Sequence, residues 1–240
     1  KNGPSAFTDT YRVSKFGNGS NPIAGWTGAF NNLQDALGAA GAGDEIWVAA
    51  GVYMPGDTVS DSFKLVPGVA VYGGFTGTET ARSERDWHAN TTVLSGDIDG
   101  NDKTDSRGIA ASSNDIEGDN SYHVVYAEMV SGTAVLDGFT ITGGSAVLEK
   151  GNNDNGGGFY CEGHNTSLFI DGECSPKLVH ITFSGNAAVY GGGMYNHGLE
   201  GVSDPVLRDV IFTGNSATKY GGAMVNNAQD GKSRPLLTNV

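Results

Sequence analysis

The chain has 240 residues, a length that suits one elongated all-β domain, and 38 of them are glycine. Glycine is costly inside helices and favourable where the backbone needs a positive φ, so this composition indicates a turn-rich β structure. The net charge of −13 argues against nucleic acid or an anionic membrane surface as a partner, and no apolar run is long enough for a transmembrane segment.

Helical periodicity appears near the amino terminus. Four apolar residues fall on one helical face: Phe30, Leu33, Leu37 and Ala40. Gly41 follows at the position where a helix would stop. An amphipathic helix here would cover the open end of a stacked β core, so we predict an amino-terminal cap over residues 1–43.

Short strands follow this helix. The apolar segments 44–54, 63–75 and 90–98 are typical of strands in repeats of irregular length. We assign the β domain to residues 44–240. Because the chain stops at Val240 inside a repeat, we expect the domain to continue in the full-length protein.

The segment DIDGNDKTD carries the best candidate metal ligands in the sequence. Oxygen-bearing side chains occur here at close spacing, as they do in calcium loops: Asp97, Asp99, Asn101 and Asp105. The segment departs from the EF-hand pattern, because Gly100 is at the fourth position and Gly108 is at the place of the bidentate glutamate. A solvated acidic turn is the alternative to a calcium site.

Two cysteines, Cys161 and Cys174, enclose twelve residues. A disulfide between them would close a small loop and stabilise the fold by about 3 kcal/mol. The alternative is two thiols in a reducing compartment. Low charge and an acidic balance favour an exported protein, and therefore the disulfide.

A repeat organises the second half of the chain. Leucine is followed by apolar residues three and five positions later, and two of the leucines, Leu178 and Leu207, are 29 residues apart. A fixed period of this size is typical of a solenoid, and apolar residues two apart indicate strands. We predict an all-β parallel β-helix in which the chain bends between each repeat leucine and the apolar residue three positions later. Its predicted core consists of Leu136, Phe139, Ile141, Leu178, Ile181, Phe183, Leu207, Val210, Phe212 and Leu237.

Two turns recur in the same register. Asn186 and Asn215 end strands, where asparagine tolerates the left-handed conformation and can stack on its equivalent in the next repeat. A second corner contains pairs of glycines, at which positive φ or close approach would exclude a side chain: Gly191, Gly192, Gly221 and Gly222. A phosphate-binding loop is disfavoured, because neither a helix start nor a lysine follows these glycines.

The segment WTGAFNNLQDALGAAGAGDEIWVAAGVYMP resembles the cap and first coil of secreted bacterial β-helix proteins. The Phe-x-x-Asn motifs at 183–186 and 212–215, and Gly221-Gly222-Ala223 before Met224, are similar to repeats of chlamydial polymorphic outer membrane proteins. These resemblances imply a right-handed, pectate-lyase-like parallel β-helix in an extracellular or cell-surface protein. Such proteins serve adhesion or display, although many fold relatives are polysaccharide lyases or hydrolases.

Catalytic groups do not form a recognisable set in the sequence. Arginines near the acidic segment and aspartates near strand ends are the candidates: Arg82, Arg85, Arg107, Asp137, Asp171 and Asp209. Four histidines fall at unrelated repeat positions, so we expect them in turns or at the surface: His123, His164, His180 and His197.

Three hypotheses follow. The first is a non-catalytic surface β-helix for adhesion, display or scaffolding, with a glycan or a host cell surface as its partner. The second is a calcium-assisted polysaccharide lyase or hydrolase. The third is a subunit that self-associates end to end into an extracellular filament.

Overall fold

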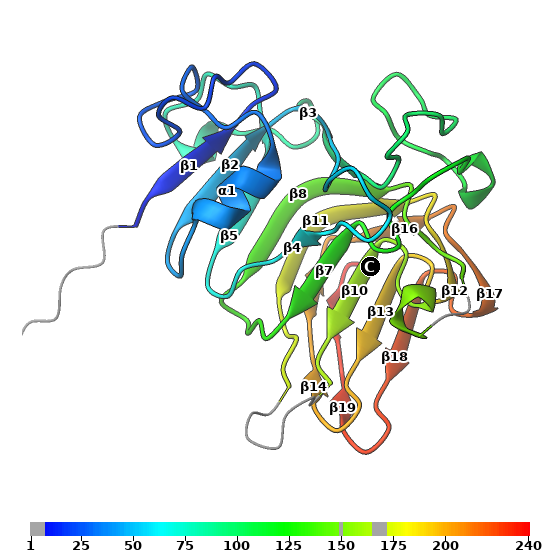
Figure 1. The fold of residues 1–240 in the computed structure, drawn as a ribbon. Coiled ribbons are helices and arrows are strands. Elements are labelled where there is room, and N and C mark those ends of the chain that lie inside the picture. Colours follow the sequence, from blue (N-terminus) through cyan, green and yellow to red (C-terminus); the bar gives the residue numbers. More distant parts are fainter. Residues whose placement is uncertain (1–7, 149–150, 165–171) are drawn as a thin grey trace, which may run out of the picture.

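Parallel strands make up most of the structure, a computed structural model that describes residues 8–148, 151–164 and 172–240. Within these residues every ladder between two strands is parallel. The prediction of an all-β fold is therefore confirmed, and Figure 1 shows the five-stranded sheet lying in front of the long, bent strands β8 and β11.

The sheets are formed by strands from successive repeats. The largest contains, in the described residues, β1 (Thr10–Val13), β2 (Glu45–Ala49), β3 (Gly51–Tyr53), β5 (Ala70–Phe75), β6 (Thr92–Ser95), β8 (Val135–Thr142), β11 (Lys177–Ser184), β15 (Val206–Arg208), β16 (Ile211–Thr213) and β20 (Leu236–Thr238). The second runs in the order β18 (Met224–Asn227), β13 (Met194–His197), β10 (Phe159–Glu162), β7 (Val125–Glu128) and β4 (Phe63–Lys64).

Smaller elements complete the architecture. A three-stranded sheet contains β17 (Ser216–Tyr220), β12 (Ala187–Tyr190) and β9 (Ser145–Ala146), and β14 (Val202–Ser203) pairs with β19 (Lys232–Ser233). Three short 3-10 helices lie in the described loops: η1 (Arg82–Glu84), η2 (Ser113–Asp115) and η3 (Gly151–Asp154).

The predicted amphipathic helix is present as α1 (Leu33–Ala39). Asn32 caps it, because its side-chain oxygen accepts a hydrogen bond of 2.8 Å from the backbone N–H of Asp35. Leu33 and Leu37 are buried, and the helix packs against β1, β2 and β4. Phe30 lies before the helix and bridges to β1, so the helix begins later than its apolar face suggested.

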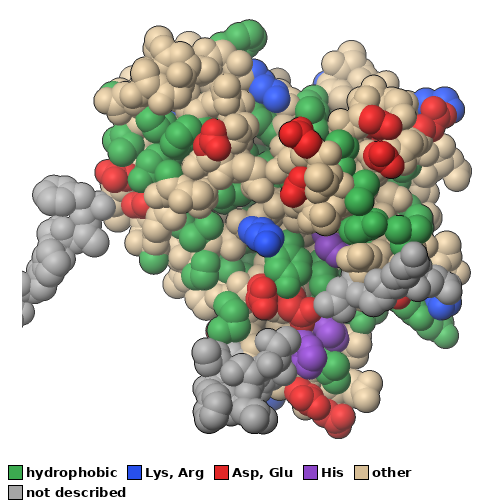
Figure 2. Space-filling view, in the orientation of Figure 1, with side chains coloured by type: hydrophobic (Ala, Val, Ile, Leu, Met, Phe, Trp, Pro, Cys, Tyr) green, Lys and Arg blue, Asp and Glu red, His purple; other side chains and the backbone are tan. Residues whose placement is uncertain are grey.

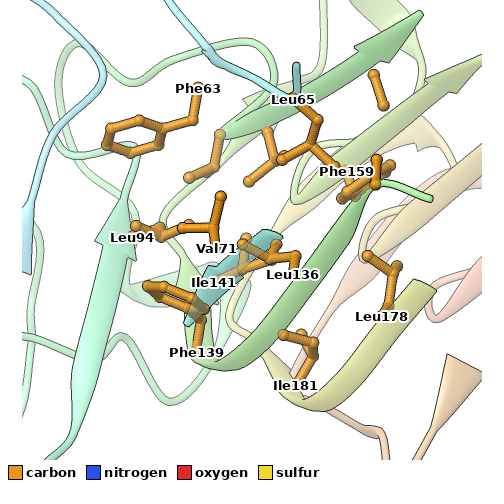
Figure 3. Close-up of a cluster of buried hydrophobic side chains, with 14 of the residues drawn as sticks. Phe63, Leu65, Val71, Leu94, Leu136, Phe139, Ile141, Phe159, Leu178 and Ile181 are labelled. Atoms are coloured by element: carbon orange, nitrogen blue, oxygen red, sulfur yellow. The ribbon is translucent and has the colours of Figure 1, made fainter. Parts of the chain in front are cut away.

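The repeat leucines stack in register. Leu178 pairs with Leu136 on one side and with Leu207 on the other, and Leu207 pairs with Leu237. The phenylalanine positions do the same, because Phe183 lies between Ile141 and Phe212. The side chains of these columns form the core between the sheets, and Figure 3 shows the part of it around Leu136 and Leu178.

Two of the predicted core residues are not fully enclosed. Leu237 is 46 % exposed and Phe212 is half-buried, whereas the other predicted core residues are buried. The reason lies in the pairing: β20 has β15 on one side and no described strand on the other. Leu237 therefore takes its predicted place in the leucine column, next to Leu207, but lies at the unpaired edge of the described sheet.

The turns follow the prediction in part. Gly191 and Gly221 have φ of +67°, and a Cβ on Gly192 would lie 2.1 Å from a carbonyl oxygen, so both predicted reasons for glycine occur at this corner. At the other turn, however, Gly185 and Gly214 take the left-handed conformation, and the asparagines that follow them do not. The left-handed assignment of Asn186 and Asn215 was wrong.

These asparagines instead form a buried ladder. Asn186 is fully buried and donates to Asn215 Oδ1 at 2.9 Å and to the Ile141 carbonyl at 3.0 Å. Its own Oδ1 accepts from the Gly144 N–H at 3.0 Å. The predicted stacking of the two asparagines in register is present, and it satisfies backbone groups that the turn leaves unpaired.

Candidate functional site

A column of left-handed residues crosses the largest sheet. It occupies the second position after each repeat leucine, with φ of +86° at Gly138, +50° at His180, +56° at Asp209 and +53° at Asn239. Histidine, aspartate and asparagine are among the non-glycine residues that adopt this conformation most readily. The left-handed residue turns the strand, so that the repeat leucine and the apolar residue three positions after it both point into the core. This explains why these two apolar residues are three positions apart rather than two.

An open groove of about 720 Å³ lies over this column. It is lined from four successive repeats, by Trp87 and His88 at one end and by His180, Thr182, Asp209 and Asn239 along its length. Its direction therefore follows the stacking of the strands. Most of these side chains carry hydrogen-bonding groups.

Charged side chains form a connected network in and beneath the groove. Arg85 donates to Asp137 Oδ2 at 2.7 Å, and His180 Nδ1 donates to Asp137 Oδ1 at 2.8 Å. His180 Nε2 lies 3.7 Å from Asp209 Oδ2, and Asn239 donates to Asp209 Oδ1 at 2.6 Å. The side chains of Arg85 and Asp137 are only 9 % and 11 % exposed, so this ion pair is largely shielded from water.

Glycines allow the segment after η1 to lie on the sheet. A Cβ on Gly138 would lie 2.8 Å from Arg85 Nη1, and one on Gly74 would lie 2.7 Å from the Trp87 backbone. Trp87 is thereby held with its ring stacked on His180, at 4.0 Å between ring centroids. Because Asp137 fixes Nδ1 and Trp87 fixes the ring plane, the His180 imidazole has a defined orientation in the groove.

The structure brings together three residues that the sequence presented as scattered: Arg85, Asp137 and His180, with Asp209 beside them. Both Asp137 oxygens already accept hydrogen bonds, one from Arg85 and one from His180, so this carboxylate is an orienting group rather than a free acid or base. Arg107 also lines the groove, whereas Arg82 pairs with Glu45 away from this network. Asp171 lies outside the described residues.

The predicted calcium ligands lie in the loops between β6 and β7, where acidic side chains gather on the surface (Figure 2). Asp97 Oδ1 accepts from the Gly100 and Asn101 N–H groups at 2.9 and 3.1 Å. Asp99 accepts from the Asn101 side chain at 2.8 Å. Asp105 accepts from Arg107 Nη2 at 2.7 Å. These carboxylates therefore have partners within their own turns, and calcium binding here stays a prediction.

Asp102 is the most perturbed acid of this region, and the sequence pattern did not single it out. Burial raises its pKa to about 6, and the nearby charges of Asp97 and Asp99 add to the rise. Its oxygens accept from the Glu117 N–H at 2.7 Å and from Asn120 at 2.9 Å, and these bonds oppose the rise.

The histidines are less scattered than predicted. His123 is buried beside Tyr160, and burial lowers its pKa to about 4. His164 and His197 lie next to each other beside the buried Glu162. The repeat spacing concealed this group, because the chain from β10 to β13 is longer than the chain between later repeats.

The predicted disulfide is confirmed. Cys161 and Cys174 are joined by an S–S bond, with 5.6 Å between their Cα atoms. Cys161 is in β10, directly before Glu162, so the cross-link also fixes the end of that strand.

Comparison with known proteins adds one match. The Chlamydia polymorphic membrane protein (Chlamydia_PMP) repeat matches residues 209–223, which begin in the left-handed column and end at the glycine corner. This agrees with the resemblance drawn from the Phe-x-x-Asn and Gly-Gly-Ala motifs. No curated protein and no solved structure matches the chain. Among the described residues, no helix has the length and apolar character needed to cross a membrane.

Proposed function

We propose that the chain is part of an extracellular or cell-surface right-handed parallel β-helix that binds a glycan in the groove without cleaving it. The groove carries this proposal, because it crosses four successive repeats. A linear polymer lying along it would meet a polar side chain at each strand, about every 4.8 Å. Adhesion to a glycan-covered surface, or display on one, is the corresponding biological role.

The register of the repeats supports the β-helix. Strands from each repeat pair with their equivalents in two neighbouring repeats, as in β10 between β7 and β13. In this proposal residues 44–240 form the helix and residues 1–43 form its cap, of which residues 1–7 lie outside the described part. The Chlamydia repeat match to residues 209–223 and the disulfide both favour a surface protein.

The chemistry of the groove suits a polyhydroxylated ligand. His180, Asp209 and Asn239 offer donors and acceptors in a row, and the half-buried ring of Trp87, which is stacked on His180 and has Arg85 over it, lines one end. Arg107, which is paired with Asp105, and the imidazole of His88 also line the groove, so a glycan bearing both hydroxyl and carboxylate groups would find donors there. The backbone conformation alone does not require polar side chains here, because glycine also adopts the positive φ of this column, as at Gly138.

Retention on a panel of neutral and acidic polysaccharides tests the proposal. We expect the wild-type chain to be retained by at least one of them. Asp209→Asn keeps a residue suited to positive φ and removes the carboxylate, and Trp87→Ala removes the aromatic surface; each is expected to weaken binding at least about tenfold. Tyr220→Ala is the matched control, because this tyrosine is 70 % exposed on a different sheet.

The result that would contradict the proposal is retention that persists in both groove variants. Loss of retention in Tyr220→Ala alone would move the binding site to the stacked pair Tyr190 and Tyr220, whose ring centroids are 5.9 Å apart. Unfolding transitions of each variant show whether a loss of binding reflects a loss of structure.

A second candidate function is polysaccharide cleavage, and the Arg85, Asp137 and His180 network favours it. Asp137 orients the imidazole of His180 so that Nε2 lies toward Asp209, an arrangement that can move a proton. Cleavage would release new chain ends from a polysaccharide. His180→Gln would abolish that release, whereas in a pure binding protein it would alter retention alone.

A further inference from the structure

Three possible metal ligands meet at the ends of two neighbouring strands. Glu162 is the last residue of β10 and pairs with His197, the last residue of β13. His164 follows β10 by two residues. One ligand atom from each of the three lies within 4.8 Å of the others. In Figure 2, histidine side chains lie beside acidic ones over this end of the five-stranded sheet.

Two of the ligand atoms are joined by a hydrogen bond that a metal ion would replace, and Tyr160 Oη also lies 3.0 Å from His197 Nδ1. Glu162 Oε1 and His197 Nδ1 are 2.9 Å apart. On a tetrahedral ion with bonds of 2.0–2.1 Å, two ligands are separated by about 3.3 Å. The His164 ring centroid lies 5.3 Å from that of His197, so a ligand atom of this third residue is within 4.8 Å of the other two.

Neighbouring groups donate hydrogen bonds to the Glu162 carboxylate, as the residues around a metal site do to its ligands. Tyr160 donates to Glu162 Oε2 at 2.6 Å, and the His164 N–H donates to Glu162 Oε1 at 2.9 Å. Glu162 is 4 % exposed and His197 12 % exposed, while His164 is half-buried. Hydrogen bonds to a ligating carboxylate fix its orientation and raise metal affinity.

Two acidic residues are directly opposite each other at this end of the five-stranded sheet. Glu128 pairs with Glu162 in the adjacent strand, so two carboxylates lie on the same face of neighbouring strands. Like charges directly opposite each other destabilise a sheet. The next residue along the ladder is His197, so an ion at this point would offset the repulsion.

We propose that Glu162, His164 and His197 bind one divalent transition-metal ion of the zinc class. Two imidazoles and one carboxylate are a ligand set that such ions prefer, whereas calcium prefers oxygen ligands alone. Bound there, the ion cross-links β10 to β13 next to the disulfide and keeps a fourth coordination position open. This site is separate from the glycan groove and does not depend on it.

Metal titration of the whole chain tests the site. The chain is prepared without a histidine tag, treated with chelator and titrated calorimetrically with Zn²⁺, and Co²⁺ is then used as a spectroscopic probe. We expect one ion per chain and visible cobalt bands typical of a tetrahedral site with nitrogen and oxygen ligands. Ca²⁺ is not expected to displace either ion.

Substitutions assign the ligands. His164→Ala and His197→Ala are each expected to weaken zinc binding by at least about 100-fold. His88→Ala is the matched control, because it removes an exposed imidazole elsewhere and should bind as wild type. His164 is half-buried, so its variant keeps the fold even if substitution of Glu162 does not. Absence of zinc binding to the folded wild type, or binding unchanged in His164→Ala, would overturn the proposal.

Discussion

The ring of Phe183 lies parallel to that of Phe212, with 4.8 Å between centroids and 8° between planes. This separation is the spacing of neighbouring strands in a sheet. One repeat therefore sits on the next without lateral offset, and the core consists of columns of equivalent side chains.

Phe183 is the residue whose loss should most weaken these columns. It is fully buried, so we expect Phe183→Ala to lower the free energy of unfolding by about 3–5 kcal/mol. Phe16→Ala is the control, because Phe16 is 95 % exposed and its loss should change the value by less than about 0.5 kcal/mol. Urea unfolding measures the free energy of unfolding of both variants. Equal losses in the two would contradict the claim that the stacked column around Phe183 stabilises the fold.

The asparagine ladder should be as important as the apolar columns. Asn186→Ala leaves the Ile141 carbonyl and the Gly144 N–H without their partner in a buried turn. We expect a loss of about 2–4 kcal/mol in unfolding free energy, which exceeds the value of one exposed hydrogen bond. Asn31→Ala, at an exposed position, should cost almost nothing. A small effect at Asn186 would mean that water replaces its bonds.

The repeat, the helix and the disulfide were predictable because each has a local sequence signature. Leucine spacing fixes which residues stack, and Gly41 marks the helix end to within two residues. The left-handed residues were assigned to Asn186 and Asn215 because asparagine tolerates that conformation, but each follows a glycine that adopts it at lower cost.

The groove and the histidine cluster were not predictable in the same way. Arg85, Asp137 and His180 are separated by 52 and 43 residues and meet only through the register of the sheet. Glu162 and His197 pair across an irregular repeat, so the period that aligned the later repeats did not align them. Sequence spacing predicts a bend after each repeat leucine, but it reveals neither the left-handed conformation of His180 and Asp209 nor the loop that places Trp87 over His180.

The disulfide should stabilise the fold by lowering the conformational entropy of the unfolded chain. The two cysteines are 13 residues apart, so we expect reduction to lower the free energy of unfolding by about 3 kcal/mol. The double variant Cys161→Ala, Cys174→Ala should have this lower stability with or without reductant. If reductant shifted the double variant as much as wild type, the effect would not come from the cross-link.

His123 makes stability depend on pH. Its pKa is about 4 in the folded protein, against 6.5 for the free side chain, because burial disfavours the charged form. As pH falls below about 6.5 the unfolded chain takes up a proton that the folded chain does not. Up to about 3 kcal/mol of stability, present above pH 6.5, should therefore be lost between pH 6.5 and 4.

Comparison of variants isolates this contribution from other titrating groups. His123→Gln should flatten the decline between pH 6.5 and 4, whereas His88→Gln, at an exposed position, should follow wild type. Urea unfolding at a series of pH values gives the slopes. Identical slopes for wild type and His123→Gln would contradict the assignment.

The most direct test of the proposed function follows bound chain and new polysaccharide ends in the same incubation. A polysaccharide that retains the wild-type protein is incubated with it, with Asp209→Asn and with His180→Gln, and both reducing and unsaturated ends are counted over time. A groove that binds without cleaving predicts retention by wild type, loss of retention in Asp209→Asn, and end counts equal to the protein-free blank. Ends that increase with wild type and not with His180→Gln would contradict this account and identify the groove as an active site.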